Sequence, residues 1–332
     1  MPYAPLHLTL VVPRLQHRPV DERLPALETL LARGAWTHTA DAGLESCLFR
    51  LFGVNLPEGA DAPVGALCRL ADTGIPNDGW WSRADPVHLM ADRDRVFLAG
   101  TDDLQVPDEE AQALVGTFNA HFAADALHLE ALTAHRWYLT ADTPLQLTAT
   151  PPEQVLGADI HDYLPSGADA PRWRAWLTET QMLFHTHRVN LDREARGEPV
   201  VNGLWLWGVG RLPQSLPMEW KGVTGNGCLG LGLAKHAGTP TDSFAGASGF
   251  ERWAPGREGC QLVIFEAQSP IEELEVRWLS PALRSLRAGS LVSLTLEFCD
   301  GRACTATAGA LRRWWWRRRP WQYYLETGRD GG

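Results

Sequence analysis

The chain has 332 residues, of which 45% are hydrophobic and 21% are charged, and its formal net charge is -10. This length and apolar content are enough for one large or two ordinary packed domains. The acidic balance argues against a general nucleic-acid coat, because affinity for phosphate backbones rests on positive charge. The N-terminal MPYAPLHLTLVVPRL has no basic region before its apolar run, unlike a secretory signal. No apolar stretch is long enough to cross a bilayer, so we expect a soluble, cytoplasmic protein.

Strand and helix patterns alternate through the first half of the chain. Short apolar runs predict strands, and apolar periodicity near 3.6 residues predicts helices. We expect strands at Leu6–Val12, Pro86–Ala91, Arg95–Ala99, Leu127–Leu132 and Arg136–Thr140. We expect helices at Asp21–Ala32, Gly43–Phe52, Ala62–Ala71 and Asp108–Phe122.

The second half begins with a long helical pattern and ends with a hairpin. We expect one helix over Ala170–Arg196, then a charged turn and a strand at Leu204–Trp207. The glycine-rich Gly222–Gly259 predicts loops around a short helix at Gly230–His236. The later elements are a strand at Cys260–Ala267, a helix at Pro270–Leu286, and a hairpin of Leu291–Phe298 with Arg302–Ala306. These elements predict an α/β fold with a mixed β-sheet layered with helices. We expect residues 1–332 to form a single unit, with a weak boundary near 141–150.

The stretch Thr178–Gly210 mixes polar and large apolar side chains densely. Polar groups in such a setting cost stability unless they find partners. The stretch therefore predicts a buried hydrogen-bond network or a binding site. The candidate ligand-binding residues are Glu179, Gln181, His187, Asn190, Arg193, Arg196, Asn202, Trp205 and Trp207.

Two interpretations of these residues stay open. Arg193 and Arg196 at a helix end could clamp a phosphate or carboxylate, or they could neutralise the helix C-terminus. Asn190 and Asn202 flank the turn, so they could contact a ligand or organise the loop itself.

No pattern in the sequence predicts a metal or a cofactor. His185 and His187 are two residues apart, so on a helix they cannot both face one ion. The six cysteines are scattered without a CxxC pair. Gly225-Asn-Gly227-Cys-Leu-Gly230 has the letters of a dinucleotide loop. We expect no strand directly before it and only a short helix after it, and we interpret the match as coincidence.

The segment Leu311–Trp321 interleaves five arginines with four tryptophans. Such a segment could stack on bases and grip phosphates, or lie on a membrane surface. It could also dock on the protein through its tryptophans, with arginines paired to the acidic excess. Because the net charge is negative, we expect docking. The alternative is a nucleic-acid or partner surface formed by Arg312, Arg313, Arg317, Arg318 and Arg319.

Several motifs resemble the RpfE-type regulatory proteins of proteobacteria, which are often described as relatives of cofactor-independent phosphoglycerate mutases. The matching segments are Ala84–Leu89, His135–Leu139, Gly157–Gly167, Glu179–Leu183, Val189-Asn190, Arg193-Glu194, Gly197 and Val201–Gly208. Asn202-Gly-Leu-Trp-Leu-Trp-Gly208, followed by Gly210-Arg-Leu-Pro213, is similar to the Trp-Leu-Trp-Gly segment of archaeal-type mutases in the alkaline-phosphatase superfamily. The resemblance implies a smaller version of the alkaline-phosphatase or phosphoglycerate-mutase-like core.

The resemblance also implies where catalytic groups should stand. Mutases of this type hold two metal ions through Asp and His, and a Ser takes the phosphoryl group. This chain has Val12-Pro13-Arg14, Gln268–Glu273 and Phe298–Gly301 at the corresponding places. Two-metal phosphoryl transfer depends on Asp and His ligands at these places, and the three segments do not follow the family's pattern of such residues.

The resemblance and these departures together imply a non-catalytic or regulatory protein, a pseudoenzyme without metal or cofactor. It would act through a small anionic ligand or a protein partner. The alternative is a phosphoglycerate mutase-like isomerase. In that case Arg193, Arg196, His187 and Asn190 would be its anion-binding and acid–base groups.

Overall fold

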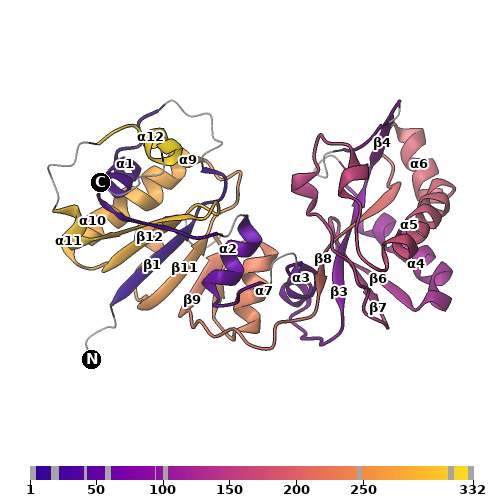
Figure 1. Ribbon diagram of the computed structural model, residues 1–332, viewed down its shortest axis with the longest axis horizontal. Helices are drawn as coiled ribbons and strands as arrows, with labels where there is room; N and C mark the ends of the chain where they lie inside the picture. The colour runs from indigo at the N-terminus through magenta and orange to yellow at the C-terminus, as the bar shows by residue number, and fades with distance from the viewer. Residues whose placement is uncertain are drawn as a thin grey trace. The chain divides into compact units, whose positions relative to one another are not determined.

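The computed structural model of the chain describes residues 5–15, 22–40, 43–56, 61–93, 95–99, 104–244, 249–312 and 318–327. By its internal contacts the chain divides into unit 1, Met1–Asn55 with Ser215–Gly332, and unit 2, Leu56–Gln214 (Figure 1). The region 141–150, where we expected a weak boundary, lies inside unit 2. Two contact-based units can belong to one domain. The expectation that residues 1–332 form a single domain therefore stays a prediction.

Unit 1 is built on a seven-stranded mixed sheet in the order β10-β9-β11-β1-β12-β13-β2. The first five strands in this order run parallel, and β13 pairs antiparallel with both β12 and β2. The strands are β1 (Leu6–Val11), β2 (Ala35–His38), β9 (Gly222–Gly225), β10 (Thr241–Asp242), β11 (Gly259–Ile264), β12 (Ser293–Glu297) and β13 (Arg302–Thr307).

Helices cover both faces of this sheet because successive side chains of each strand point to opposite sides. Val263 and Phe265 join the core that also contains residues of α1, α10 and α12. Ile264 points the other way, against Gly230 of α7. The helices of unit 1 are α1 (Pro25–Arg33), α2 (Leu44–Leu51), α7 (Cys228–His236), α8 (Phe250–Trp253), α9 (Ile271–Glu273), α10 (Ser280–Ala288), α11 (Ala308–Leu311) and α12 (Trp321–Thr327).

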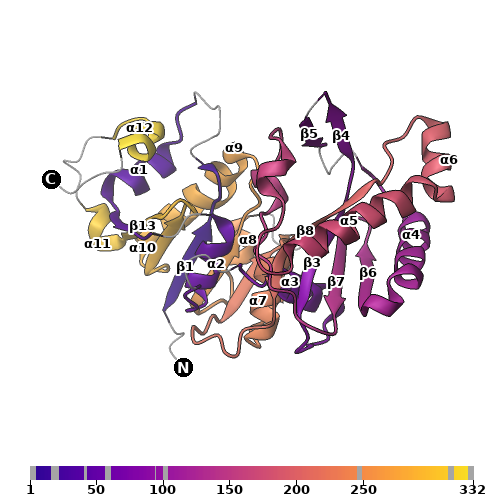
Figure 2. The same cartoon turned by 45° about the vertical axis from the view of Figure 1, so that its right-hand side comes forward.

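Unit 2 contains a four-stranded antiparallel sheet in the order β6-β7-β3-β8 (Figure 2). One face carries apolar side chains such as Ala84 and Leu206 and packs against α4 and α5. The other face carries Arg83, Asp85 and Tyr138, and α3 packs against it. The strands are β3 (Trp81–Val87), β6 (Leu127–Thr133), β7 (Arg136–Ala141) and β8 (Gly203–Gly210), with a separate hairpin of β4 (Leu89–Asp92) and β5 (Arg95–Leu98).

The helices of unit 2 lie between these strands in the sequence. They are α3 (Val64–Thr73), α4 (Asp108–His121), α5 (Ala170–His185) and α6 (Arg188–Arg196), with short 3₁₀ turns η3 (Ala123–Asp125), η4 (Pro152–Gln154) and η5 (Ile160–Tyr163). Within the described ranges, no helix has the length and apolar character needed to span a membrane.

The predicted α/β class is confirmed, but the predicted helix Ala170–Arg196 was wrong. The chain leaves the helix after His185, and α6 begins at Arg188. His187 has extended backbone angles, and its side chain caps α6 by accepting the N–H of Val189. The carbonyl of Phe184 accepts a hydrogen bond from the side chain of Asn190. These local side-chain contacts compete with the continuous helix.

The sequence analysis did not predict β2, β3, β9 and β10, and two of these, β9 and β3, have sequences that do not look like strands. β9 reads Gly-Val-Thr-Gly, yet it is hydrogen-bonded between β10 and β11. Consequently a strand does precede the glycine motif that begins at Gly225, and that part of our reasoning was wrong. β3 carries charged Arg83 and Asp85, which pair with each other. The predicted helix Pro270–Leu286 is present as α9, α10 and an intervening π-helical stretch, η7 (Leu274–Leu279).

Candidate functional site

The turn after α6 is held by two asparagine side chains. Asn190 is buried, and its Oδ1 accepts the N–H of Val201 at 2.9 Å while its Nδ2 donates to the carbonyl of Val201 at 2.7 Å. Asn202 makes the same type of pair with Leu89, at 2.6 Å for the N–H and 2.8 Å for the carbonyl. Both amides thus pair with backbone in the manner of a strand ladder. The structure uses these two candidate residues to connect α6, the turn and β4.

Arg193 and Arg196 share an ion-pair network at the C-terminal end of α6. Nη1 of the buried Arg193 lies 2.7 Å from Oε2 of Glu110, and its Nε donates to the carbonyl of Pro199 at 2.7 Å. The more exposed Arg196 contacts both Glu110 and Glu198 at 2.7 Å. Arg196 donates hydrogen bonds to the carboxylates of Glu198 and Glu110, which raise the pKa of Arg196, and the bond to Glu198 lowers the pKa of that glutamate. Both guanidinium groups are therefore neutralised within the protein.

His187 is a capping residue with a defined tautomer. Its Nδ1 accepts the Val189 N–H at 3.2 Å, and its Nε2 lies 3.1 Å from Oγ1 of Thr117. The Thr117 hydroxyl can donate to the carbonyl of Ala113, so the neutral histidine carries its proton on Nε2. Burial lowers the pKa of His187, which favours this neutral form.

The remaining sequence candidates do not gather around the turn. Glu179 is exposed on α5 and lies 3.3 Å from Nε2 of His121, and Gln181 is half-buried on the same helix. Trp205 donates from Nε1 to the carbonyl of Thr150 at 2.8 Å. The candidates therefore occupy several separate places in unit 2.

Trp207 belongs to a buried polar cluster on the sheet of unit 2. Its Nε1 donates to Oδ2 of Asp85 at 2.7 Å, and Nε of Arg83 donates to Oδ1 of the same carboxylate at 2.9 Å. The Arg83 guanidinium also lies 5.2 Å from the centre of the Trp207 ring. Such a satisfied network stabilises the pairing of β3 with β8.

Two cavities adjoin the turn. One has a volume of about 740 Å³ and is lined by residues that include His135, Arg193, Arg196 and Glu198. The other has a volume of about 550 Å³ and is lined by residues that include His88 and Val200. The first cavity presents guanidinium groups, the usual partners of phosphate, but Glu110 and Glu198 already contact them.

The arginine-rich segment near the C-terminus is described only in part. Arg313 and Arg317 lie outside the described residues. Arg312, Arg318 and Arg319 are exposed, and the Arg319 guanidinium lies 4.1 Å from the centre of the Tyr323 ring. A nucleic-acid or partner surface here stays a prediction.

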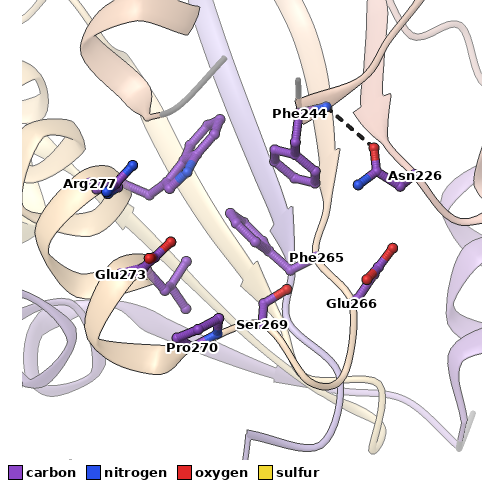
Figure 3. A pocket seen from close by; sticks show the side chains of 10 residues that line it. Asn226, Phe244, Phe265, Glu266, Ser269, Pro270, Glu273 and Arg277 are labelled. Carbon is purple, nitrogen blue, oxygen red and sulfur yellow. Dashed lines mark hydrogen bonds between the residues drawn. The ribbon is translucent and has the colours of Figure 1, made fainter. Parts of the chain in front are cut away.

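Unit 1 has a cavity that sequence reasoning did not identify. It lies where the parallel strands β10, β9 and β11 end, has a volume of about 320 Å³, and is drawn in Figure 3. Ligands of parallel α/β sheets commonly bind at this edge. Its polar lining residues are Asn226, Glu266, Ser269, Glu273 and Arg277, and its aromatic ones are Phe244, Phe265 and Trp278. Such a cavity is expected where adjacent parallel strands end. The sequence analysis did not predict β9, so it could not place these strand ends side by side.

The groups at this edge of the sheet do not fit a two-metal centre. Glu297 at the end of β12 is buried, and its Oε2 lies 2.8 Å from Nη2 of Arg50. β1 is followed by Val12-Pro13-Arg14, which supplies no carboxylate. Among the described residues, no group of three or more His, Cys, Asp or Glu side chains could hold a metal ion.

Comparison with known proteins relates the chain to one group of enzymes. No family model matches it. The 2,3-bisphosphoglycerate-independent phosphoglycerate mutase of Methanosarcina barkeri is 28% identical over 175 residues, covering 51% of this chain and 43% of the mutase. The mutase of Methanothrix thermoacetophila is 35% identical over 91 residues, covering 27% of this chain and 23% of the mutase. This chain is similar to cofactor-independent phosphoglycerate mutases. It spans less than half the length of these curated relatives.

A solved structure shares the fold of this chain over most of its length. The PH0037 protein from Pyrococcus horikoshii superposes with a TM-score of 0.56 and 14% identity, covering 92% of this chain and 88% of that protein. At this identity the likeness concerns the fold alone. The predicted resemblance to phosphoglycerate mutases is supported by the sequence relatives, whereas the RpfE-type assignment stays a prediction.

Proposed function

We propose that this chain is a phosphoglycerate mutase-like protein that moves a phosphoryl group from one hydroxyl to another of a phosphorylated hydroxy acid. The observation that carries the proposal is the similarity to the Methanosarcina barkeri mutase, which extends over 51% of this chain. The activity is our proposal because the chain spans less than half of that enzyme.

The cavity beside α6 is the place in unit 2 that best suits a phosphorylated ligand. Arg193 and Arg196 line it, and His135 lies at its wall. A phosphate could take the place of Glu198, whose side chain is 43% exposed, while Glu110 continues to hold Arg193. Bidentate guanidinium contacts would orient the ligand and neutralise its charge.

An assay of the purified full chain tests the proposal. We expect conversion of 3-phosphoglycerate to 2-phosphoglycerate, measured by phosphorus NMR both without added metal and with Mn²⁺, Mg²⁺ or Zn²⁺, because the described residues offer no group of three metal-ligating side chains. Arg196→Gln should lower the rate. Arg188→Gln is the matched control, because Arg188 lies on the same helix and contacts only Asp192 in the described ion pairs. Rates equal to the reagent blank both without metal and with each of the three metals would contradict the proposal.

A second candidate is a non-catalytic relative, of the RpfE regulatory type, that acts through a small ligand or protein partner. The pairing of Glu297 with Arg50 favours it, since this carboxylate at the sheet edge is already neutralised. Two-metal phosphoryl transfer needs free carboxylate and imidazole ligands. Calorimetric binding of 3-phosphoglycerate without turnover would support this candidate. Absence of both binding and turnover would contradict it for this ligand.

A further inference from the structure

We infer that the cavity at the ends of β10, β9 and β11 binds a small zwitterion with an apolar side group, of the aromatic amino-acid class. This proposal is independent of the mutase-like function, because it concerns a different cavity, in unit 1. It rests on three observations: an aromatic wall, a mixed set of exposed charges, and a small volume.

Three rings form the wall of the cavity. Phe265 and Trp278 are buried. Phe244 is half-buried and comes from the segment after β10. The rings of Phe244 and Phe265 lie side by side in the cavity (Figure 3). The Trp278 ring lies edge-on to both phenyl rings, with centroids 5.4 Å from Phe265 and 5.9 Å from Phe244. Ring pairs with this geometry are favourable and fix the side chains relative to one another. The wall therefore offers a preformed apolar surface to a planar or branched group.

Charges of both signs stand beside these rings. Glu273 and Arg277 are exposed and lie one helical turn apart, and Glu266 follows β11 on the other side of the cavity. Within the described part of the chain, neither Glu273 nor Arg277 forms a salt bridge, although residues at this spacing can do so, as Arg188 and Asp192 do. An ammonium group could contact the glutamates while a carboxylate contacts Arg277. A zwitterion is complementary to this arrangement.

The same charges disfavour a phosphoglycerate. Two carboxylates and one guanidinium leave the lining with a net negative charge, as Glu266, Glu273 and Arg277 are its charged members. A phosphorylated acid would bring two anionic groups to a site with one cation, and like charges at short range oppose binding. The volume of about 320 Å³ also lies at the small end of ligand cavities. An amino acid fits this volume and charge.

Three probes that share a phenyl ring on a two-carbon chain but differ in charge test the inference on the full chain. L-phenylalanine is a zwitterion, phenethylamine carries only the cation, and 3-phenylpropionate carries only the anion. We expect calorimetry or ligand-observed NMR to give the strongest binding for L-phenylalanine, in the millimolar range or tighter, and the weakest for 3-phenylpropionate. No binding of L-phenylalanine, or stronger binding of the anion, would overturn the inference.

Variants assign the binding to this cavity. Glu273→Gln should lower the affinity for L-phenylalanine and for phenethylamine by about threefold to fivefold, the range expected for a partly exposed charge contact. Arg277→Gln should lower the affinity for L-phenylalanine but raise the affinity for phenethylamine. A purely structural change would not give opposite effects on these two probes. Glu272→Gln is the control, because Glu272 is exposed on α9 and does not line the cavity.

Loss of the apolar wall gives a second, independent measurement. Phe244→Ala should lower the affinity for L-phenylalanine more than the affinity for glycine, and thermal melting checks that the variant remains folded. Equal affinities in Phe244→Ala, Glu273→Gln and the parent would show that the probe binds elsewhere and would overturn the inference. Mutase assays give a separate readout, so failure of one proposal leaves the other testable.

Discussion

The side-chain amide of Asn190 pairs with the backbone of Val201 through both its oxygen and its nitrogen, at 2.9 and 2.7 Å. Its nitrogen also donates to the carbonyl of Phe184 at 2.8 Å. One side chain thereby joins the end of α5, the start of α6 and the residue before Asn202. These contacts leave the amide little capacity for an external ligand, so its main effect should be on stability.

Asn190→Ala should lower the free energy of unfolding by about 3 kcal/mol, because buried N–H and carbonyl groups of Val201 lose their partners. Urea titration of the full chain measures the change. Thr178→Ala, at an exposed position on α5, is the control and should change stability by less than about 0.5 kcal/mol. A small effect of Asn190→Ala on stability together with lost ligand binding would restore the ligand role for this residue.

Arg193→Ala should be more destabilising than Arg188→Ala. Arg193 is buried and holds Glu110 and the carbonyl of Pro199, whereas Arg188 is exposed and contacts Asp192. Removing one member of a buried pair costs about 3 kcal/mol or more, and an exposed pair contributes about 0.5 kcal/mol. Urea titration of both variants tests the difference, and equal losses would contradict the network described here.

Asp61→Asn should stabilise unit 2 at neutral pH but not in acid. Burial raises the pKa of Asp61 to about 6, although the backbone N–H groups of Ala149 and Val209 act in the opposite direction. A raised pKa means that the folded chain binds this proton more tightly than the unfolded chain does. The resulting stability is complete below the ordinary Asp pKa and is lost as the pH rises through about 6.

The expected gain for Asp61→Asn is about 1 kcal/mol near pH 7.5, after allowance for partial exposure to solvent. The gain should disappear near pH 3, below the ordinary Asp pKa, where Asp61 is largely protonated in both states. Thermal melting between these pH values measures it, with the exposed Asp162→Asn as control. A gain that does not depend on pH would contradict the assignment to Asp61.

Two glycine-to-alanine variants should have opposite effects on stability. A Cβ on Gly65 of α3 would lie 2.5 Å from Cα of Ser82 in β3, so the helix would have to move away from the strand. We expect Gly65→Ala to destabilise by about 1–3 kcal/mol. Gly116 in α4 has open space around the same position, and Gly116→Ala should stabilise by about 0.5–1 kcal/mol. Equal effects in thermal melting would contradict the close approach of α3 to β3.

Elements with a strong local signal were predicted well from the sequence. The helix expected at Asp108–Phe122 is α4, Asp108–His121, because its acidic first turn and apolar periodicity both act locally. The strand pairs Leu127–Leu132 with Arg136–Thr140, and Leu291–Phe298 with Arg302–Ala306, match β6 with β7 and β12 with β13. Each pair is joined by a short turn, so its register depends on neighbouring residues.

Elements that depend on distant partners were missed. β9 has only four residues, two of them glycine, and is a strand because β10 and β11 pair with it on both sides. The polar residues of β3 can be buried because Arg83 and Trp207 both donate hydrogen bonds to the carboxylate of Asp85. The sheet-edge cavity depended on β9, and so it too was beyond local reasoning.

The order and type of most elements, the α/β class and the density of polar groups in Thr178–Gly210 were determined by the sequence itself, because periodicity and turn chemistry are local. The tertiary structure decided which polar groups are free. It assigned Asn190 and Asn202 to backbone pairs and Arg193 to Glu110, and it brought Phe244, Glu266 and Arg277 from separate segments to one cavity. Partnership of this kind depends on strand order and helix packing, which join residues far apart in the chain.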